Sequence, residues 1–120
     1  MAIERERLLP VWFTDAYRAA HPAAVDRYAA ELLATPAEGY AACCEAIGAM
    51  DLRPDLPAIT APTLVVTGAD DPASPPAHGR AIAAAVPGAR YVTVPGAAHL
   101  ASVEQPAAVG TLLTDHLERA

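Results

Sequence analysis

The sequence predicts an α/β protein in which a helical segment is followed by a β-α-β-α unit with parallel strands. Apolar residues in the segment 1–50 recur at the spacing of helix faces. The segment 63–120 alternates short β-branched runs with alanine-rich stretches, a pattern typical of strands joined by helices. Three prolines in the segment 51–62 oppose helix continuation and predict a linker. The 120 residues suffice for one small core, so we expect these parts to fold as one unit.

The helical segment contains two predicted helices joined at a threonine and a proline. A single apolar face, ending near Ala34, is formed by Val25, Tyr28, Ala29, Leu32 and Leu33. The run Thr35-Pro-Ala-Glu38 has the composition of a capping box and predicts a second helix over 36–49. Cys43 and Cys44 are adjacent on that helix, so we expect them to be reduced and to serve in packing, with a reactive thiol at either position as the alternative.

Two strands are predicted in the second half of the chain, over 63–68 and 91–95. Both runs are short, uncharged and rich in β-branched residues, as in parallel strands covered on both faces. Pro75 and Pro76 suit the first turn of the intervening helix, and Pro87-Gly88 ends it. A closing helix carries Val109, Leu112, Leu113, His116 and Leu117 on one face.

Composition argues against several classes of function. Eight arginines, no lysine and fourteen acidic residues give a net charge of −6, which repels phosphate backbones and argues against nucleic-acid binding. No stretch approaches the roughly 20 apolar residues that span a bilayer, and the first ten residues are too charged for a signal peptide. We therefore expect a cytoplasmic protein with no membrane partner.

Chemistry in open α/β sheets gathers beyond the carboxyl ends of the strands. The loop after the first strand, 68–75, contains Asp70 and Asp71, and the loop after the second strand contains His99. An aspartate that fixes the imidazole tautomer would let the other ring nitrogen act as a base. Aspartate and histidine also occur on loops for turn formation and solvation, so the spacing alone leaves that alternative open.

These two loops resemble the end of an α/β-hydrolase, in which Gly-x-x-Asp-x-x-x-Pro supplies the triad acid and a later Gly-x-x-His supplies the base. By that resemblance Asp71 is the acid, because it lies three residues after Gly68 and four before Pro75. His99 is the base, three residues after Gly96, and Asp70 is a solvated turn residue.

The chain further resembles the 3-oxoadipate enol-lactonases, which hydrolyse an enol-lactone ring in the β-ketoadipate pathway of aromatic catabolism. The segments 12–14 and 39–47 carry this narrower resemblance. It implies that residues 1–50 form a helical cap over the site and that Trp12 lines the substrate pocket, although a single tryptophan on a helix also serves in packing. It also implies a carboxylate on the substrate, which could pair with a cap arginine: Arg5, Arg7, Arg18 or Arg27.

The family's nucleophile motif, Gly-x-Ser-x-Gly, does not occur in this sequence. The two serines, Ser74 and Ser102, are each expected to cap a helix, Ser102 together with Gln105. The sequence thus resembles the C-terminal portion of the fold, a cap followed by the last two strands, and the isolated chain is expected to be inactive.

The resemblance implies a small lactone or ester as substrate and neither a metal nor an organic cofactor. His78 and His99 come from different loops without further ligands, which argues against zinc. Two alternatives stay open: another α/β-hydrolase activity, such as that of an esterase, haloperoxidase or dehalogenase, or an inert fragment that acts as an interaction module. An unpaired sheet edge predicts self-association or binding of a complementing N-terminal hydrolase half.

Overall fold

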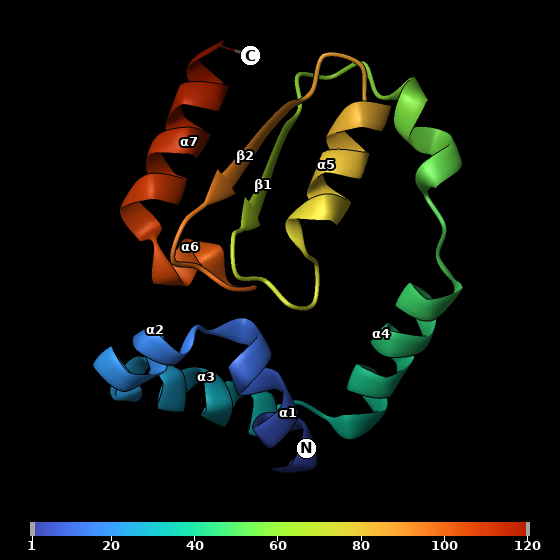
Figure 1. Cartoon of the computed structure of the whole chain (residues 1–120). Coiled ribbons are helices and arrows are strands. Elements are labelled where there is room, and N and C mark those ends of the chain that lie inside the picture. The colour runs from blue at the N-terminus through green and yellow to red at the C-terminus, as the bar shows by residue number, and fades with distance from the viewer. Residues whose placement is uncertain (1, 120) are drawn as a thin grey trace.

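The computed structural model describes residues 2–119, with side chains from residue 6 onward (Figure 1). Helices come first, followed by a short 3-10 helix and by strands that alternate with helices. The elements are α1 (Ala2–Trp12), α2 (Asp15–Ala20), α3 (Pro22–Ala34), α4 (Ala37–Ala49), η1 (Arg53–Ala58), β1 (Leu64–Gly68), α5 (Pro76–Ala85), β2 (Arg90–Val94), α6 (Ala101–Glu104) and α7 (Pro106–Arg119). The predicted order, a helical segment followed by a β-α-β-α unit, is confirmed.

The first three helices pack around Phe13, which is fully buried. Its ring stacks on Tyr17 at a centroid distance of 5.3 Å. The face predicted for α3 supplies the opposite wall, because Val25 and Ala29 are buried against it. Leu33 does not belong to that face, since 46% of it is exposed. Leu100 and Val103 also pack against this cluster, so it joins the N-terminal helices to the segment around α6.

The capping box predicted at Thr35 is wrong. Thr35 is the C-cap of α3, and its hydroxyl donates to the carbonyl of Glu31 at 3.0 Å. The N-cap of α4 is Pro36, which has no side-chain hydrogen bond to offer. The Thr35 hydroxyl therefore caps the end of α3, whereas the sequence pattern predicted that it would cap the start of α4.

Helix α4 buries none of its residues within the described chain (Figure 1). Cys43 and Cys44 are free, as expected, but both are exposed, so the packing role predicted for them is wrong. The linker that follows contains η1 and leads into β1.

The two strands are parallel and pair in register from Leu64 with Arg90 to Gly68 with Val94. Helix α5 crosses from one to the other and packs on one face of the sheet (Figure 1). Gly79 permits this close approach, because a Cβ at this position would lie 2.5 Å from Thr67 Cγ2 and 2.7 Å from Tyr91 Cε2. Helix α5 can therefore lie directly on β1 and β2, the strands that lead into the loops of Asp71 and His99.

The other face of the sheet packs on α7. Val94 and Val109 are buried together, with Val66 and Leu112 partly buried beside them. The predicted face of α7 is confirmed only in its first turns, because Leu113 is 50% exposed and Leu117 is 74% exposed. Helices cover both faces as expected, yet residues 64–67 are only half-buried, since the described sheet has two strands.

The serines do not cap helices in the predicted way. The N-cap of α5 is Pro75 rather than Ser74, and the N-cap of α6 is Leu100. Ser102 lies inside α6, while the side-chain amide of Gln105 donates to the carbonyl of Gly96 at 3.1 Å. In both cases the predicted N-cap lies one or two residues away from the N-cap in the structure.

None of the helices among residues 2–119 combines the length and apolar character that crossing a bilayer requires.

Candidate active site

The loops after β1 and β2 meet at the carboxyl edge of the sheet (Figure 1). The amide of Ala69 donates to the carbonyl of Val94 at 2.9 Å. The amide of Asp70 donates to the carbonyl of Ala97, also at 2.9 Å. These two bonds continue the strand pairing into the loops, so the residues that follow start from fixed positions.

Asp71 and His99 lie within hydrogen-bonding distance across these loops. His99 Nδ1 is 2.9 Å from Asp71 Oδ2. The other carboxylate oxygen accepts the amides of Ala73 at 2.8 Å and Ser74 at 3.0 Å. The Asp71 side chain is 5% exposed, whereas that of His99 is 38% exposed. The structure thus brings together the two residues singled out in the sequence, with the carboxylate buried and the imidazole open to solvent.

The pKa of Asp71 is lowered from its ordinary value of 3.8. Burial raises this pKa. Hydrogen bonds from the Ser74 amide, the His99 ring and the Ala73 amide, together with the charge of a protonated His99, lower it by more than burial raises it. Asp71 is therefore a carboxylate at neutral pH.

This arrangement suits proton transfer through His99 Nε2. A carboxylate can only accept a hydrogen bond, so Nδ1 is the protonated nitrogen of the neutral ring. Nε2 then has a free lone pair, and no hydrogen bond to it occurs within residues 2–119. The geometry permits Nε2 to take a proton from a hydroxyl or a water molecule.

Gly68 permits the close contact between the two loops. A Cβ at this position would lie 2.1 Å from the carbonyl oxygen of Ala98 and 2.4 Å from that of Ala97. Since no side chain fits at such distances, the last residue of β1 must be glycine for the His99 loop to pass beside it.

The backbone around His99 is also bonded to the end of α1. The amide of Leu100 donates to the carbonyl of Trp12 at 3.0 Å, and the amide of His99 to that of Val11 at 3.4 Å. The Trp12 side chain is half-buried and packs against the cluster around Phe13. Trp12 is thus close to His99 in the backbone, while its side chain contributes to packing; the pocket-lining role stays a prediction.

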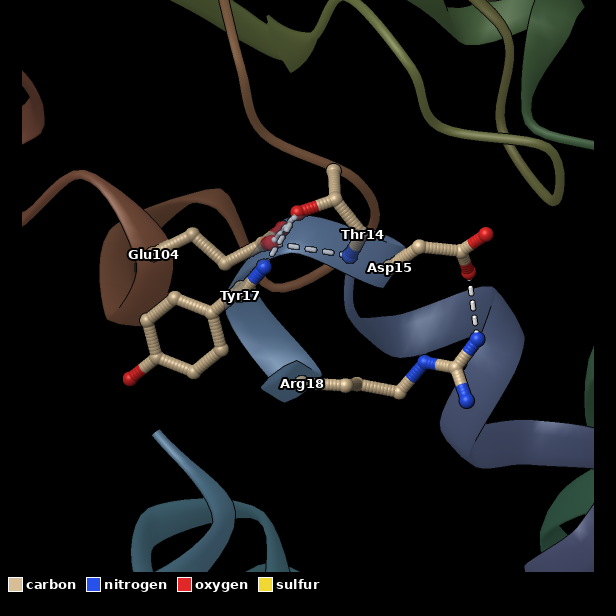
Figure 2. Close-up of polar contacts among 5 residues, drawn as sticks. All are labelled: Thr14, Asp15, Tyr17, Arg18 and Glu104. Atoms are coloured by element: carbon tan, nitrogen blue, oxygen red, sulfur yellow. Dashed lines mark hydrogen bonds and ion pairs between the residues drawn. The ribbon is translucent and has the colours of Figure 1, made fainter. Parts of the chain in front are cut away.

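A second buried carboxylate, Glu104, was not identified in the sequence. It is 7% exposed, and its Oε2 accepts the amide of Ala98 at 2.5 Å. Its Oε1 accepts the amide of Thr14 at 2.8 Å and the hydroxyl of Thr14 at 2.7 Å (Figure 2). The sequence around Glu104 shows only an acidic residue five positions after His99, because its partner Thr14 is 90 residues away.

The remaining predicted residues lie outside this arrangement. Asp70 is exposed, as expected for a turn residue, and Ser102 is exposed on α6. Among the cap arginines, Arg18 pairs with Asp15 (Figure 2), Arg27 lies 5.0 Å from the ring centroid of Tyr28, and Arg7 is exposed. The side chain of Arg5 lies outside the described residues.

Within the described part of the chain, no group of three or more histidine, cysteine, aspartate or glutamate side chains is placed to hold a metal ion.

Comparison with known proteins shows what this chain is similar to. The model of the alpha/beta hydrolase family matches residues 2–111. The chain is 38% identical over 97 residues to 3-oxoadipate enol-lactonase 2 of Acinetobacter baylyi, which covers 81% of this chain and 36% of that protein. The enol-lactonase of Burkholderia xenovorans LB400 superposes with a TM-score of 0.96 at 40% identity, over 98% of this chain and 45% of that one. A thermophilic esterase of Thermogutta terrifontis gives a TM-score of 0.91 at 30% identity, over 98% and 43%.

The chain belongs to the alpha/beta hydrolase family. It spans less than half the length of these relatives, which is consistent with a C-terminal portion of the fold. The resemblance identified in the sequence is thereby confirmed at the level of the family and of its similarity to enol-lactonases.

Replacing Gly68 by alanine is expected to separate the two loops. A Cβ would overlap two backbone carbonyls that cannot move without breaking the loop pairing, so we expect a loss of about 1–3 kcal/mol in the free energy of unfolding. Urea denaturation measures this change. Gly110→Ala is the matched control, because nothing lies within 4 Å of a Cβ there and α7 should gain roughly 0.5–1 kcal/mol. Equal effects of the two substitutions would contradict the close approach.

Replacing Asp71 by asparagine is expected to change the acid dependence of stability. The pKa of Asp71 is lower in the folded chain than in the unfolded one, so its charged form stabilises the fold above the unfolded pKa, and this contribution disappears as pH falls through the folded pKa. At pH 6, Asp71→Asn should cost roughly 1–3 kcal/mol, because hydrogen bonds to a charged carboxylate are lost. The difference from the native chain should shrink below pH 4.

Urea denaturation from pH 2.5 to pH 7 measures this difference, with Asp70→Asn as the control because Asp70 is the exposed neighbouring carboxylate. A difference between the native chain and Asp71→Asn that is constant with pH would rule out a bonded carboxylate at Asp71.

Proposed function

We propose that the protein is part of a lactone or carboxylic-ester hydrolase of the 3-oxoadipate enol-lactonase type, acting in the cytoplasm in the β-ketoadipate pathway. The observation that carries this proposal is the hydrogen bond of 2.9 Å between Asp71 and His99 at the carboxyl edge of the sheet. The similarity to two enol-lactonases, at 38% and 40% identity, supports the choice of substrate.

In this proposal, His99 is first a general base and then a general acid. Its Nε2 takes the proton of a serine hydroxyl as the serine oxygen attacks the lactone carbonyl, and the resulting imidazolium is stabilised by Asp71. The ring C–O bond breaks, and the leaving oxygen receives the proton from Nε2. Water activated in the same way then cleaves the acyl-enzyme, which releases the acid and restores the serine.

The serine is proposed to belong to a part of the fold outside this sequence. Neither Ser74 nor Ser102 lies in a Gly-x-Ser-x-Gly motif, and the amide of Ser74 is already bonded to Asp71. The chain covers 45% of the Burkholderia enol-lactonase, so we propose that the nucleophile and the oxyanion donors come from the remaining part of such a fold.

Substrate contacts are proposed for the helical cap formed by residues 1–50. Trp12 is the candidate for lining the pocket, because its carbonyl is bonded to the residue after His99. A cap arginine would pair with the substrate carboxylate; Arg18 and Arg27 already contact Asp15 and Tyr28.

A second activity is supported by the similarity to the Thermogutta esterase at 30% identity over 98% of the chain. The same acid and base would serve an acyclic ester, with the cap alone changing the substrate. An inert interaction module is the alternative from another class, and it is distinguished by the absence of hydrolysis.

Hydrolysis is best tested in a chimera that replaces the matching region of the Burkholderia enol-lactonase by this chain. We expect the chimera to hydrolyse 3-oxoadipate enol-lactone with a higher kcat/KM than p-nitrophenyl butyrate. His99→Ala should lower kcat by about 10³-fold or more, because the base is lost. His78→Gln, an exposed histidine on α5, is the control and should leave kcat unchanged.

The chain alone is expected to show no hydrolysis above background. A folded chimera without activity would favour the inert module, and a preference for p-nitrophenyl butyrate would favour the esterase.

We further propose that apolar surface around α4 is covered by the complementing part of the fold, or by a second copy when that part is absent. Ile47, Met50 and Leu52, which lie close together in sequence near the end of α4, are 66%, 56% and 54% exposed. Large apolar side chains that are exposed as a group often mark a surface that another chain covers. The sheet also has an unpaired edge on each side within residues 2–119, which favours pairing with another strand.

Self-association is measured by sedimentation of the chain over a range of concentrations. We expect the average mass to rise with concentration and the rise to diminish in Ile47→Glu, which places a charge on the apolar surface. Ala30→Glu adds the same charge at an exposed position of α3 and should have no effect. A monomer at all concentrations would rule out the self-association arm.

A further inference from the structure

Glu104 is a buried carboxylate that the proposed reaction does not use. It is 7% exposed and lies at the end of α6, six residues after Ala98. A carboxylate in such surroundings must have its oxygens hydrogen-bonded, because an unpaired buried charge is strongly disfavoured. Its bonding partners therefore indicate what it holds together.

The two oxygens of Glu104 bind two different parts of the chain. Oε2 accepts the amide of Ala98, the residue directly before His99, at 2.5 Å. Oε1 accepts both the amide and the hydroxyl of Thr14 at 2.8 Å and 2.7 Å (Figure 2). Thr14 is the N-cap of α2, and its hydroxyl oxygen accepts the amide of Tyr17 at 3.2 Å. One carboxylate thus bridges the loop that contains His99, here called the base loop, and the start of α2 in the proposed cap.

The bridge acts together with two backbone bonds in the same place. The amides of His99 and Leu100 donate to the carbonyls of Val11 and Trp12, which lie three and two residues before Thr14. Three consecutive residues of the base loop, 98–100, are therefore bonded through their amides to the segment 11–14 or to the carboxylate that binds it. The backbone on each side of the His99 side chain is fixed by these bonds.

We propose that Glu104 is a positioning residue for His99: its carboxylate fixes the base loop against Thr14 so that Nδ1 points at Asp71. The inference rests on the proposed role of His99, but the geometry that it explains is a property of this chain. Asp71 is bonded to its own loop through Ala73 and Ser74, whereas the loop of His99 is bonded to the first loop at Ala97 and to the end of α1 at His99 and Leu100. Glu104 supplies a further constraint on the loop of His99.

Glu104→Gln tests this role with little change in volume. A glutamine side chain has one accepting oxygen, so its NH₂ must face a donor either at Ala98 or at Thr14, and one side of the bridge opens. The measurement is long-range ¹H–¹⁵N NMR of the imidazole rings, with His99→Gln used to assign the His99 signals. In the native chain we expect the neutral ring to have its proton on Nδ1; in Glu104→Gln the signals should shift toward the Nε2–H tautomer.

A merely structural role would lower thermal stability and leave the tautomer unchanged in the folded chain. Circular dichroism therefore accompanies each spectrum, and spectra are recorded well below the unfolding transition. Glu118→Gln removes an exposed charge from α7 and is the matched control, for which no shift is expected. A folded Glu104→Gln with the native tautomer would overturn the proposal.

The pair Thr14→Ser and Thr14→Val provides the decision if Glu104→Gln does not fold. Serine keeps the hydroxyl that donates to Glu104, whereas valine removes it at similar shape. We expect the shift toward Nε2–H in the valine variant and its absence in the serine variant; identical spectra would overturn the proposal.

A native chain without a preferred Nδ1–H tautomer would also overturn the proposal. Hydrolysis by the chimera is measured separately, so failure of the positioning role is distinguishable from failure of the proposed activity.

Discussion

The close contact between the end of β1 and the loop after β2 is the constraint on which the candidate site depends. Gly68 lies so near the carbonyls of Ala97 and Ala98 that no side chain fits between them. The amides of Ala69 and Asp70 extend the pairing of the strands by two further hydrogen bonds. Because both loops leave the sheet already joined, Asp71 and His99 meet after only three and five more residues.

Burial is divided unequally between the acid and the base, and this division suits their proposed roles. Asp71 loses its contact with water but gains two amides and an imidazole, so its charge is stabilised despite burial. His99 keeps 38% of its side chain exposed, which leaves its second nitrogen accessible. A buried carboxylate and an accessible imidazole allow one group to stay charged while the other exchanges protons.

The sequence was sufficient for elements and contacts that depend on local patterns. The β-branched runs located both strands, and the resemblance of the two loops to the α/β-hydrolase motifs implied Asp71 as the acid and His99 as the base, which lie within hydrogen-bonding distance. Helix caps were predicted less well, because a hydroxyl can serve either of two neighbouring helices: Thr35 bonds back to Glu31 rather than forward.

Contacts between distant segments were beyond prediction. Glu104 is an ordinary acidic residue until the fold brings Thr14 beside it from 90 positions away. The exposure of Cys43 and Cys44 likewise depends on which elements pack over α4, and the composition of α4 does not predict those elements. The resemblance of the two loops to a known family thus predicted the acid and the base, whereas the groups around them became visible only in three dimensions.

The separation in sequence of these contacts has a consequence for the way such a site can be inherited. Asp71 and His99 are 28 residues apart, on the loops that follow the two strands of one β-α-β unit, so a recombination event outside residues 64–99 transfers both residues together. The Glu104–Thr14 contact instead joins that unit to the helical segment before it. A recombination point between residues 14 and 64 can therefore bring in a new N-terminal helical segment only if the incoming helices present donors where Thr14 presents its amide and hydroxyl, which limits the helical segments that can precede this unit.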